Sequence, residues 1–152
     1  ENEGKIHSVR RGTVFTFPSD EWIVEFKNVI NSSEKYKEVA AQWEGDVSFI
    51  CLANSSIGLN EDYAIWADLF HGECKEAKHL SIEAAQKARY VITGDYSRWK
   101  QVIKKELDPI KGMMQGKLKL KGDLPTIVRF IKAAQELVEC SSRVPSSFLD
   151  EG

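Results

Sequence analysis

The sequence of 152 residues lacks the features of an extracellular scaffold, a membrane span or a nucleic-acid-binding surface. Its three cysteines are odd in number and widely spaced, which excludes a disulfide framework and favours a reducing compartment. No apolar run approaches the ~18 residues of a membrane-spanning helix. The net charge of −2 supplies no basic field to attract nucleic acid. Because the polar first dozen residues also lack the apolar centre of a signal peptide, we expect a single cytoplasmic domain.

Motifs of catalysis and cofactor binding are missing too. The chain has no Gly-x-Ser-x-Gly, Cys-x-x-Cys or His-Glu-x-x-His motif and no phosphate loop. His71, Cys74 and His79 lie close in sequence, but their spacing matches no zinc pattern and a fourth ligand is missing. Cys51 stands in an apolar run, which is typical of a small buried hydrophobe rather than a nucleophile. We therefore predict a protein that is not an enzyme and holds neither metal nor cofactor.

Hydrophobic periodicity predicts a mixed α+β chain. Apolar residues recur at helical spacing in some segments and at strand spacing in others, and the strands are grouped and joined by short turns. That grouping favours an antiparallel sheet with helices covering one face. The expected helices cover residues 19–30, 33–43, 95–107, 109–115 and 125–138, and the expected strands cover residues 47–53, 63–71, 73–80, 89–93 and 117–121.

Large apolar side chains gather on the helical stripes. An aromatic or methionine stripe at this spacing most often belongs to an ordinary packed core, and composition alone gives no reason to expect a cavity. Two methionines, the residue type that suits adaptable apolar surfaces, are too few to change that interpretation. The stripe residues are Trp22, Phe26, Trp43, Trp99, Met113, Met114 and Phe130.

Two ordered stretches point further. ARYVITGDYSRW (residues 88–99) combines a strand, a tight turn and a helix start, and LDPIKGMMQGKLKLKGD (residues 107–123) follows closely. This order resembles the sterol carrier protein type 2 family, the non-specific lipid-transfer domains, over residues 18–140. The resemblance implies a five-stranded, mainly antiparallel sheet covered by helices, with a hydrophobic tunnel between them. It also implies that the domain binds and carries a lipid such as a fatty acyl chain, acyl-coenzyme A, a phospholipid or a sterol-like lipid.

The same resemblance implies which residues meet the lipid. Carried over position by position, it indicates a lining of Met113, Met114, Leu118, Leu120, Ile127, Phe130, Ile131 and Leu137, with Trp22, Phe26 and Trp66 as further candidates. Residues 1–17 are then an arm or edge strand, and residues 141–152 a flexible tail. A second use of such a domain stays open, as a module that presents substrate to a lipid-metabolising enzyme or that mediates a homodimer. A plain interaction module with a filled core is a third.

Two polar features allow two interpretations each. Asp68 interrupts an apolar strand, and its side chain either points to solvent or meets the head group of a ligand in the tunnel. Lys117, Lys119 and Lys121 alternate with leucines, which is typical of a solvated strand face. No aromatic residues interleave with these lysines to stack bases, so we expect no nucleic acid as a partner. Transient contact with a membrane surface through them stays open.

Overall fold

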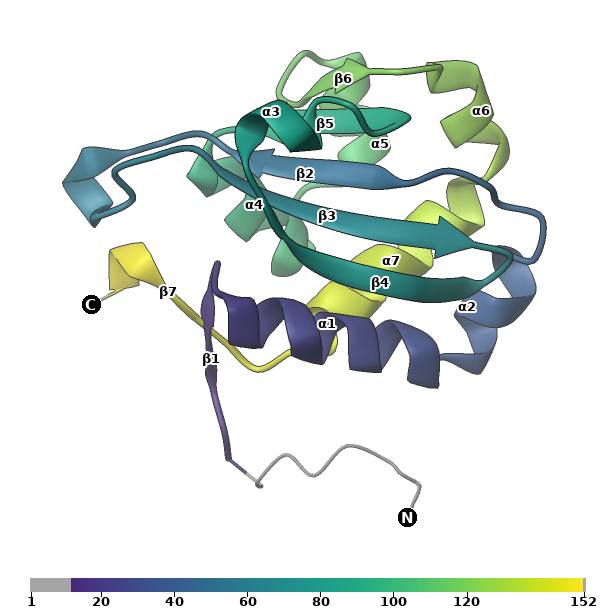
Figure 1. Ribbon diagram of the computed structural model, residues 1–152, viewed down its shortest axis with the longest axis horizontal. Helices are drawn as coiled ribbons and strands as arrows, with labels where there is room; N and C mark the ends of the chain where they lie inside the picture. Colours follow the sequence, from purple (N-terminus) through teal and green to yellow (C-terminus); the bar gives the residue numbers. More distant parts are fainter. Residues whose placement is uncertain (1–11, 152) are drawn as a thin grey trace.

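A five-stranded mixed sheet forms the centre of the computed structural model, which describes residues 12–151 (Figure 1). Its spatial order is β4-β3-β2-β5-β6, and every neighbouring pair is antiparallel except β2 and β5. The strands are β2 (Val47–Cys51), β3 (Tyr63–Phe70), β4 (Glu73–Leu80), β5 (Tyr90–Gly94) and β6 (Lys119–Lys121). The predicted α+β class and the five-stranded, mainly antiparallel sheet are therefore confirmed.

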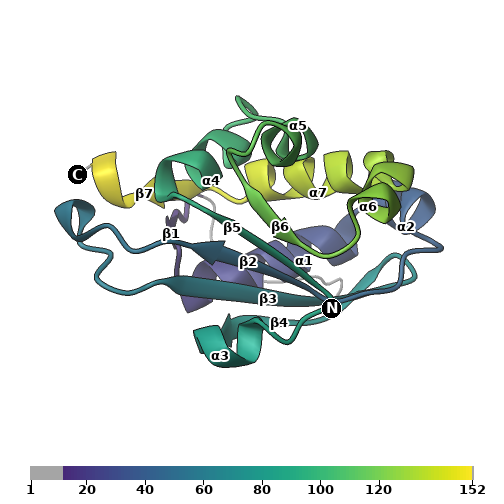
Figure 2. The ribbon, with the colours of Figure 1, turned by 90° about the horizontal axis from the view of Figure 1, so that it is seen from above.

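Helices cover both faces of this sheet, but unequally. Figure 2 shows α3 (Ile82–Ala85) on one side and α4 to α7 on the other. The larger layer consists of α4 (Tyr96–Ile103), α5 (Pro109–Met114), α6 (Leu124–Arg129) and α7 (Ile131–Arg143), with α1 (Asp20–Ser32) and α2 (Glu34–Val39) beside it. Short 3₁₀ turns lie at η1 (Ser55–Ile57) and η2 (Leu149–Glu151).

Local sequence explains where the helices begin. The Ser19 hydroxyl accepts a hydrogen bond from the backbone N–H of Trp22 at 3.1 Å, so it caps α1. Asp108 caps α5 through the N–H of Ile110 at 2.8 Å, and Pro109 follows at a position where its missing N–H leaves no bond unmade.

Strand alternation divides the sheet into two packing layers. Val47, Phe49 and Cys51 of β2 face the large helical layer, whereas Ser48 and Ile50 face α3. The Ser48 hydroxyl donates to the carbonyl oxygen of Ala85 at 2.8 Å, which ties the central strand to α3. The main core therefore lies between the sheet and α1, α4 and α7, with a smaller cluster under α3.

Helix α1 closes one edge of the sheet. The side-chain amide of Asn31 donates to the carbonyl oxygen of Cys74 at 2.9 Å and accepts from its N–H at 2.8 Å. This pair of bonds mimics a neighbouring strand on the otherwise open edge of β4. Covering an edge in this way discourages pairing with other chains.

The C-terminal region differs from the prediction. The single helix expected over residues 125–138 is two helices that meet at Phe130, whose ψ of 38° interrupts the helical backbone. Beyond α7, residues 144–151 form a segment that we call the C-terminal clasp. Its strand β7 (Ser146–Phe148) pairs in parallel with β1 (Phe15–Phe17).

The expectation of a flexible tail over residues 141–152 is therefore wrong for its described part, because Val144 and Phe148 are buried and anchor it. These two apolar residues are easily overlooked among the serines and acids around them. The edge strand considered within residues 1–17 exists as β1, but its partner is β7 rather than the main sheet. Residues 1–11 of the predicted arm lie outside the described residues.

Candidate functional site

An apolar cavity of about 120 Å³ lies between the sheet and the large helical layer. Its wall includes side chains from α1, α2, β2, β3, β5, α4, α5, α6 and α7. No charged residue lines it, and Ser141 is the one hydroxyl-bearing aliphatic residue in the described wall. The Ser141 hydroxyl already donates to the carbonyl oxygen of Val138 at 2.7 Å. The cavity therefore offers a guest shape and apolar surface rather than charge.

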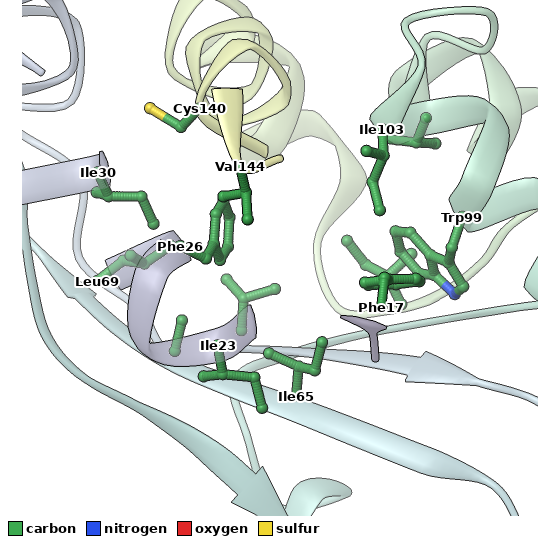
Figure 3. Packing of buried hydrophobic residues seen from close by; sticks show 14 of the residues in the cluster. Phe17, Ile23, Phe26, Ile30, Ile65, Leu69, Trp99, Ile103, Cys140 and Val144 are labelled. Atoms are coloured by element: carbon green, nitrogen blue, oxygen red, sulfur yellow. The ribbon is translucent and has the colours of Figure 1, made fainter. Parts of the chain in front are cut away.

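The wall follows from the periodicities of the sequence. Trp22 and Phe26 are four residues apart on α1 and share one face. On α7 and the residue before it, Phe130, Ala134 and Leu137 form a second stripe. Figure 3 shows Phe26, Ile65 and Trp99 converging on the same interior from three different elements. Cys51 also lines the cavity, and burial raises the pKa of its thiol.

Three tryptophans in the wall have their polar atoms satisfied by the protein itself. The indole N–H of Trp22 donates to the Ser146 hydroxyl at 2.7 Å. That of Trp43 donates to the carbonyl oxygen of Gly45 at 2.8 Å. That of Trp99 donates to the carbonyl oxygen of Ile50 at 2.8 Å. Each ring is thereby fixed in orientation and leaves only its apolar surface for the cavity.

An aromatic cluster closes the end of the cavity near β1. The Phe17 ring lies 4.8 Å from that of Trp22 and 6.1 Å from that of Phe148, measured between ring centroids. The Tyr96 hydroxyl donates to the carbonyl oxygen of Phe17 at 2.7 Å and accepts from the N–H of Leu149 at 3.0 Å. The C-terminal clasp therefore packs behind Phe17 and Trp22, the aromatic residues that line the cavity at this end.

Ion pairs hold the clasp against α4. Lys100 Nζ lies 2.7 Å from a carboxylate oxygen of Glu151 and 2.9 Å from one of Asp150, and Lys104 Nζ lies 3.0 Å from Glu151. Hydrogen bonds from Lys100 and then Lys104 lower the pKa of Glu151. All of these groups are at the surface, so solvent and salt screen the attraction.

The structure gathers part of the predicted lining around the cavity. The predicted residues that line it are Trp22, Phe26, Met113, Ile127, Phe130 and Leu137. Leu118 and Leu120 belong to the same core but lie outside the lining. Leu118 instead packs against Gly94 and Gly112, where an added Cβ would lie 2.5 Å and 3.1 Å from its methyl groups.

Three predicted residues point away from the cavity. Met114 and Ile131 are 67% and 40% exposed, because each follows an inward residue and one helical step turns it toward solvent. Trp66 lies on the α3 side of the sheet, since its neighbour Ile65 takes the inward position on β3. Its indole N–H donates to Asp46 at 2.7 Å. These three side chains therefore do not line the cavity.

The prediction also missed much of the wall. Val47, Phe49 and Ile65 come from the sheet, and Tyr36 and Tyr90 come from α2 and β5. The signal for the β2 residues was present, because apolar Val47 and Phe49 alternate with Ser48. Tyr36 shares the helical spacing of the apolar residues expected over 33–43, but that pattern does not distinguish it from an ordinary core residue.

The polar features considered from sequence lie away from the cavity. Asp68 is half-buried and shares the α3 side of β3 with Trp66, so it does not line the wall. Lys119 and Lys121 are exposed on β6, and Lys121 Nζ donates to the carbonyl oxygen of Gln86 at 3.1 Å. Lys117 is also exposed.

The three residues considered for a metal site have separate surroundings. His71 Nε2 lies 2.6 Å from a Glu44 carboxylate oxygen, and the His79 ring stacks on that of Tyr63 at 4.1 Å. Cys74 is buried under α1. Within residues 12–151, no group of three His, Cys, Asp or Glu side chains is placed to hold a metal ion. In the same range no helix combines the length and apolarity that crossing a membrane requires.

Comparisons with known proteins agree with one another. The model of the family described as "SCP-2 sterol transfer family" matches residues 25–135. A crystal structure of sterol carrier protein 2 shares 32% identity with a TM-score of 0.77, covering 83% of this chain and 97% of that chain. A solution structure from Thermus thermophilus, described as possibly sterol carrier protein, shares 32% identity with a TM-score of 0.78, covering 85% of this chain and 90% of that chain.

A more distant structure supports the fold alone. The apo form of sterol carrier protein 2 from Yarrowia lipolytica shares 15% identity with a TM-score of 0.53, covering 81% of this chain and 88% of that chain. Among curated proteins, none matches the chain.

Proposed function

This chain belongs to the SCP-2 sterol transfer family, and from that premise we propose that its cavity carries one lipid molecule as freely exchanging cargo. The observation that carries the proposal is the wall itself, which surrounds an internal space with apolar side chains and no charge. A solid core would leave no such space. A cavity lined in this way favours an apolar guest over water, because a buried water needs two to four polar partners.

The energetics suit reversible transport. Each buried methylene contributes about 0.8 kcal/mol, so a chain of about 15 methylenes gains roughly 12 kcal/mol. Association costs at least about 4 kcal/mol, which leaves at most about 8 kcal/mol, an affinity that is micromolar or weaker. Such a lipid is held against dilution in water but can still be given up to a membrane or a partner.

The empty space is smaller than such a guest. A volume of about 120 Å³ is comparable to engineered apolar cavities of ~150 Å³ that hold benzene, whereas ligand pockets typically reach ~300–1,000 Å³. A long chain therefore enters only if part of the wall moves. Three half-buried residues line the cavity in this region: Met113 on α5, Phe130 just before α7, and Leu137 on α7. We infer that the wall yields there, between α5 and α7, since methionine adapts to irregular space and α5 is a helix of six residues.

We further propose that the chain does not catalyse a reaction. The part of the lining that the structure describes contains no carboxylate, imidazole or amine to transfer a proton. Its one thiol, Cys51, is kept protonated by burial, which raises its pKa. Service to a lipid-metabolising enzyme, homodimerisation, membrane contact and a cytoplasmic location stay predictions.

The proposal is tested by mass analysis of lipid that leaves with the folded protein, together with titration of a fluorescent fatty acid. Two neighbouring methionines provide matched variants. Met113→Glu places a charge in the wall and should weaken binding at least tenfold, because a buried carboxylate is costly. Met114→Glu places the same charge in solvent and should change binding less than twofold. The carrier proposal fails if the protein takes up no lipid, or if both variants bind as well as the unmodified chain.

A further inference from the structure

The hydroxyl of Tyr36 has no partner in the described protein. Tyr36 is 1% exposed and lines the cavity. Its backbone N–H is bound by the Ser33 hydroxyl at 3.0 Å, yet its own hydroxyl makes no hydrogen bond with any residue from 12 to 151. By contrast, the Tyr96 hydroxyl has two hydrogen bonds. Buried hydroxyls nearly always have a partner, so this one is a donor with an unused hydrogen bond beside the cavity.

The surroundings of Tyr36 select the kind of guest. Burial raises the pKa of its hydroxyl, and proximity to the thiols of Cys74 and Cys140 adds to this, so the proton stays in place to be donated. Among residues 12–151, no lysine, arginine or histidine lines the cavity. Glu136 lies beyond Cys140 and is already bound by Ser33 at 2.7 Å and Arg143 at 3.1 Å. An ionised carboxylate buried beside Tyr36 would have no cation to balance it, whereas a neutral oxygen needs none.

The position of Tyr36 also orients the guest. Tyr36 stands on α2, and Trp43 follows that helix and packs on Tyr90 with ring centroids 5.1 Å apart. Tyr90 begins β5 opposite Val47, whereas Phe17 and Trp99 lie toward the other ends of these strands. An oxygen bound at Tyr36 thus leaves the hydrocarbon to extend toward β1 and α4.

We propose that the Tyr36 hydroxyl donates a hydrogen bond to a neutral hydroxyl or carbonyl oxygen at the inner end of the lipid cargo. This inference rests on the proposed carrier function and narrows its substrate class to neutral oxygenated lipids bound with the polar end inward. Tyr90 is the nearest rival. It is equally buried, but its ring packs beneath Gly45 and Gly122 and the side chain of Arg89, next to surface turns.

Three ten-carbon probes test this assignment by displacement of a fluorescent fatty acid from the full chain. They are 1-decanol, decane and decanoate at pH 8. Tyr36→Phe should weaken 1-decanol binding about five- to tenfold, the loss of one buried hydrogen bond, and leave decane binding within twofold. The unmodified chain should bind 1-decanol more tightly than decanoate. Tyr63→Phe is the matched control, because Tyr63 does not line the cavity, and it should bind all three probes as the unmodified chain does. Tyr90→Phe tests the rival, since a site at Tyr90 would move the loss of 1-decanol binding to that variant.

Stability provides a second readout. Because Tyr36→Phe removes a hydroxyl that has no partner, its urea midpoint should be no lower than that of the unmodified chain. Three results would each overturn the assignment while leaving the carrier function intact. They are a clearly lower urea midpoint for Tyr36→Phe, an unchanged affinity of Tyr36→Phe for 1-decanol, and a loss of 1-decanol binding confined to Tyr90→Phe. If the unmodified chain binds none of the three probes, the carrier function falls with it.

Discussion

Replacing Ala134 by leucine should stabilise the empty protein and weaken lipid binding at the same time. Ala134 lines the cavity in the middle of the α7 stripe, between Phe130 and Leu137. The longer side chain points into space that a lipid would otherwise occupy. Alanine and leucine have similar helix propensities, so the backbone contributes little to the difference.

The magnitude follows from the cavity volume. An unfilled apolar cavity costs about 24 cal/mol per Å³, so a volume of about 120 Å³ costs about 3 kcal/mol. The leucine adds three carbons, which contribute up to about 2.4 kcal/mol when buried, and imperfect fit subtracts about 1 kcal/mol or more. We expect a net gain of about 1 kcal/mol in the free energy of unfolding. Excluding about three methylenes of a lipid should weaken its binding roughly 50-fold.

Urea denaturation and titration with a fluorescent fatty acid measure the two effects. Ala84→Leu is the matched control, since Ala84 is exposed on α3, on the other side of the sheet. Ala84→Leu should change the free energy of unfolding by less than about 0.5 kcal/mol. It should change the lipid affinity by less than twofold. The reasoning is refuted if Ala134→Leu destabilises the protein by more than about 1 kcal/mol and leaves lipid affinity unchanged, because the space would then be neither free nor used.

Two further expectations concern titrating groups. Burial raises the pKa of Cys140 to about 11 and that of Cys74 to about 12, so both should resist a thiol reagent at pH 8 until urea is added; fast labelling of the native protein would contradict this. Hydrogen bonds from Lys100 and Lys104 lower the pKa of Glu151 in the folded protein below its usual 4.5. The ionised Glu151 therefore helps to hold the clasp above pH 4.5, and this contribution is lost as the pH falls through the lowered pKa. The protection factor of the Leu149 amide, which allows for slower intrinsic exchange in acid, should accordingly fall at acidic pH in the unmodified chain, and a profile identical to that of Glu151→Gln would count against the ion pair.

The sequence predicted the main sheet because its strand signals are local. Alternation and β-branched residues mark β2, β3 and β5, and the turn residues between strands favour antiparallel neighbours. The parallel pairing of β2 and β5 has no local signal, because it depends on how the chain returns after α3. The pairing of β1 with β7 joins segments about 130 residues apart, so no pattern in either segment predicts it.

The candidate site was predictable only where helical phase was clear. Met113 and Phe130 line the cavity as expected, yet Met114 and Ile131, one residue further on, do not. A family resemblance indicates which segments line a wall. Successive residues of a helix point about 100° apart around its axis, so a shift of one position decides which side chain reaches the cavity. Tyr36 escaped notice because an unpaired hydroxyl is a property of its surroundings, which the sequence does not display.

The cavity persists because its two walls differ in rigidity. The indoles of Trp43 and Trp99 donate hydrogen bonds to the backbone carbonyls of Gly45 and Ile50, before and within β2, so these large rings are tied to the sheet and cannot rotate to fill the space. On the helical side, Met113 and Leu137 have no such restraint and are half-buried. A guest that needs more than the available volume will therefore displace α5 and α7 before it displaces the sheet. Under the proposed carrier function, the protein therefore keeps only about 120 Å³ open and leaves the remaining space to form around a guest, which limits the stability lost while it is empty.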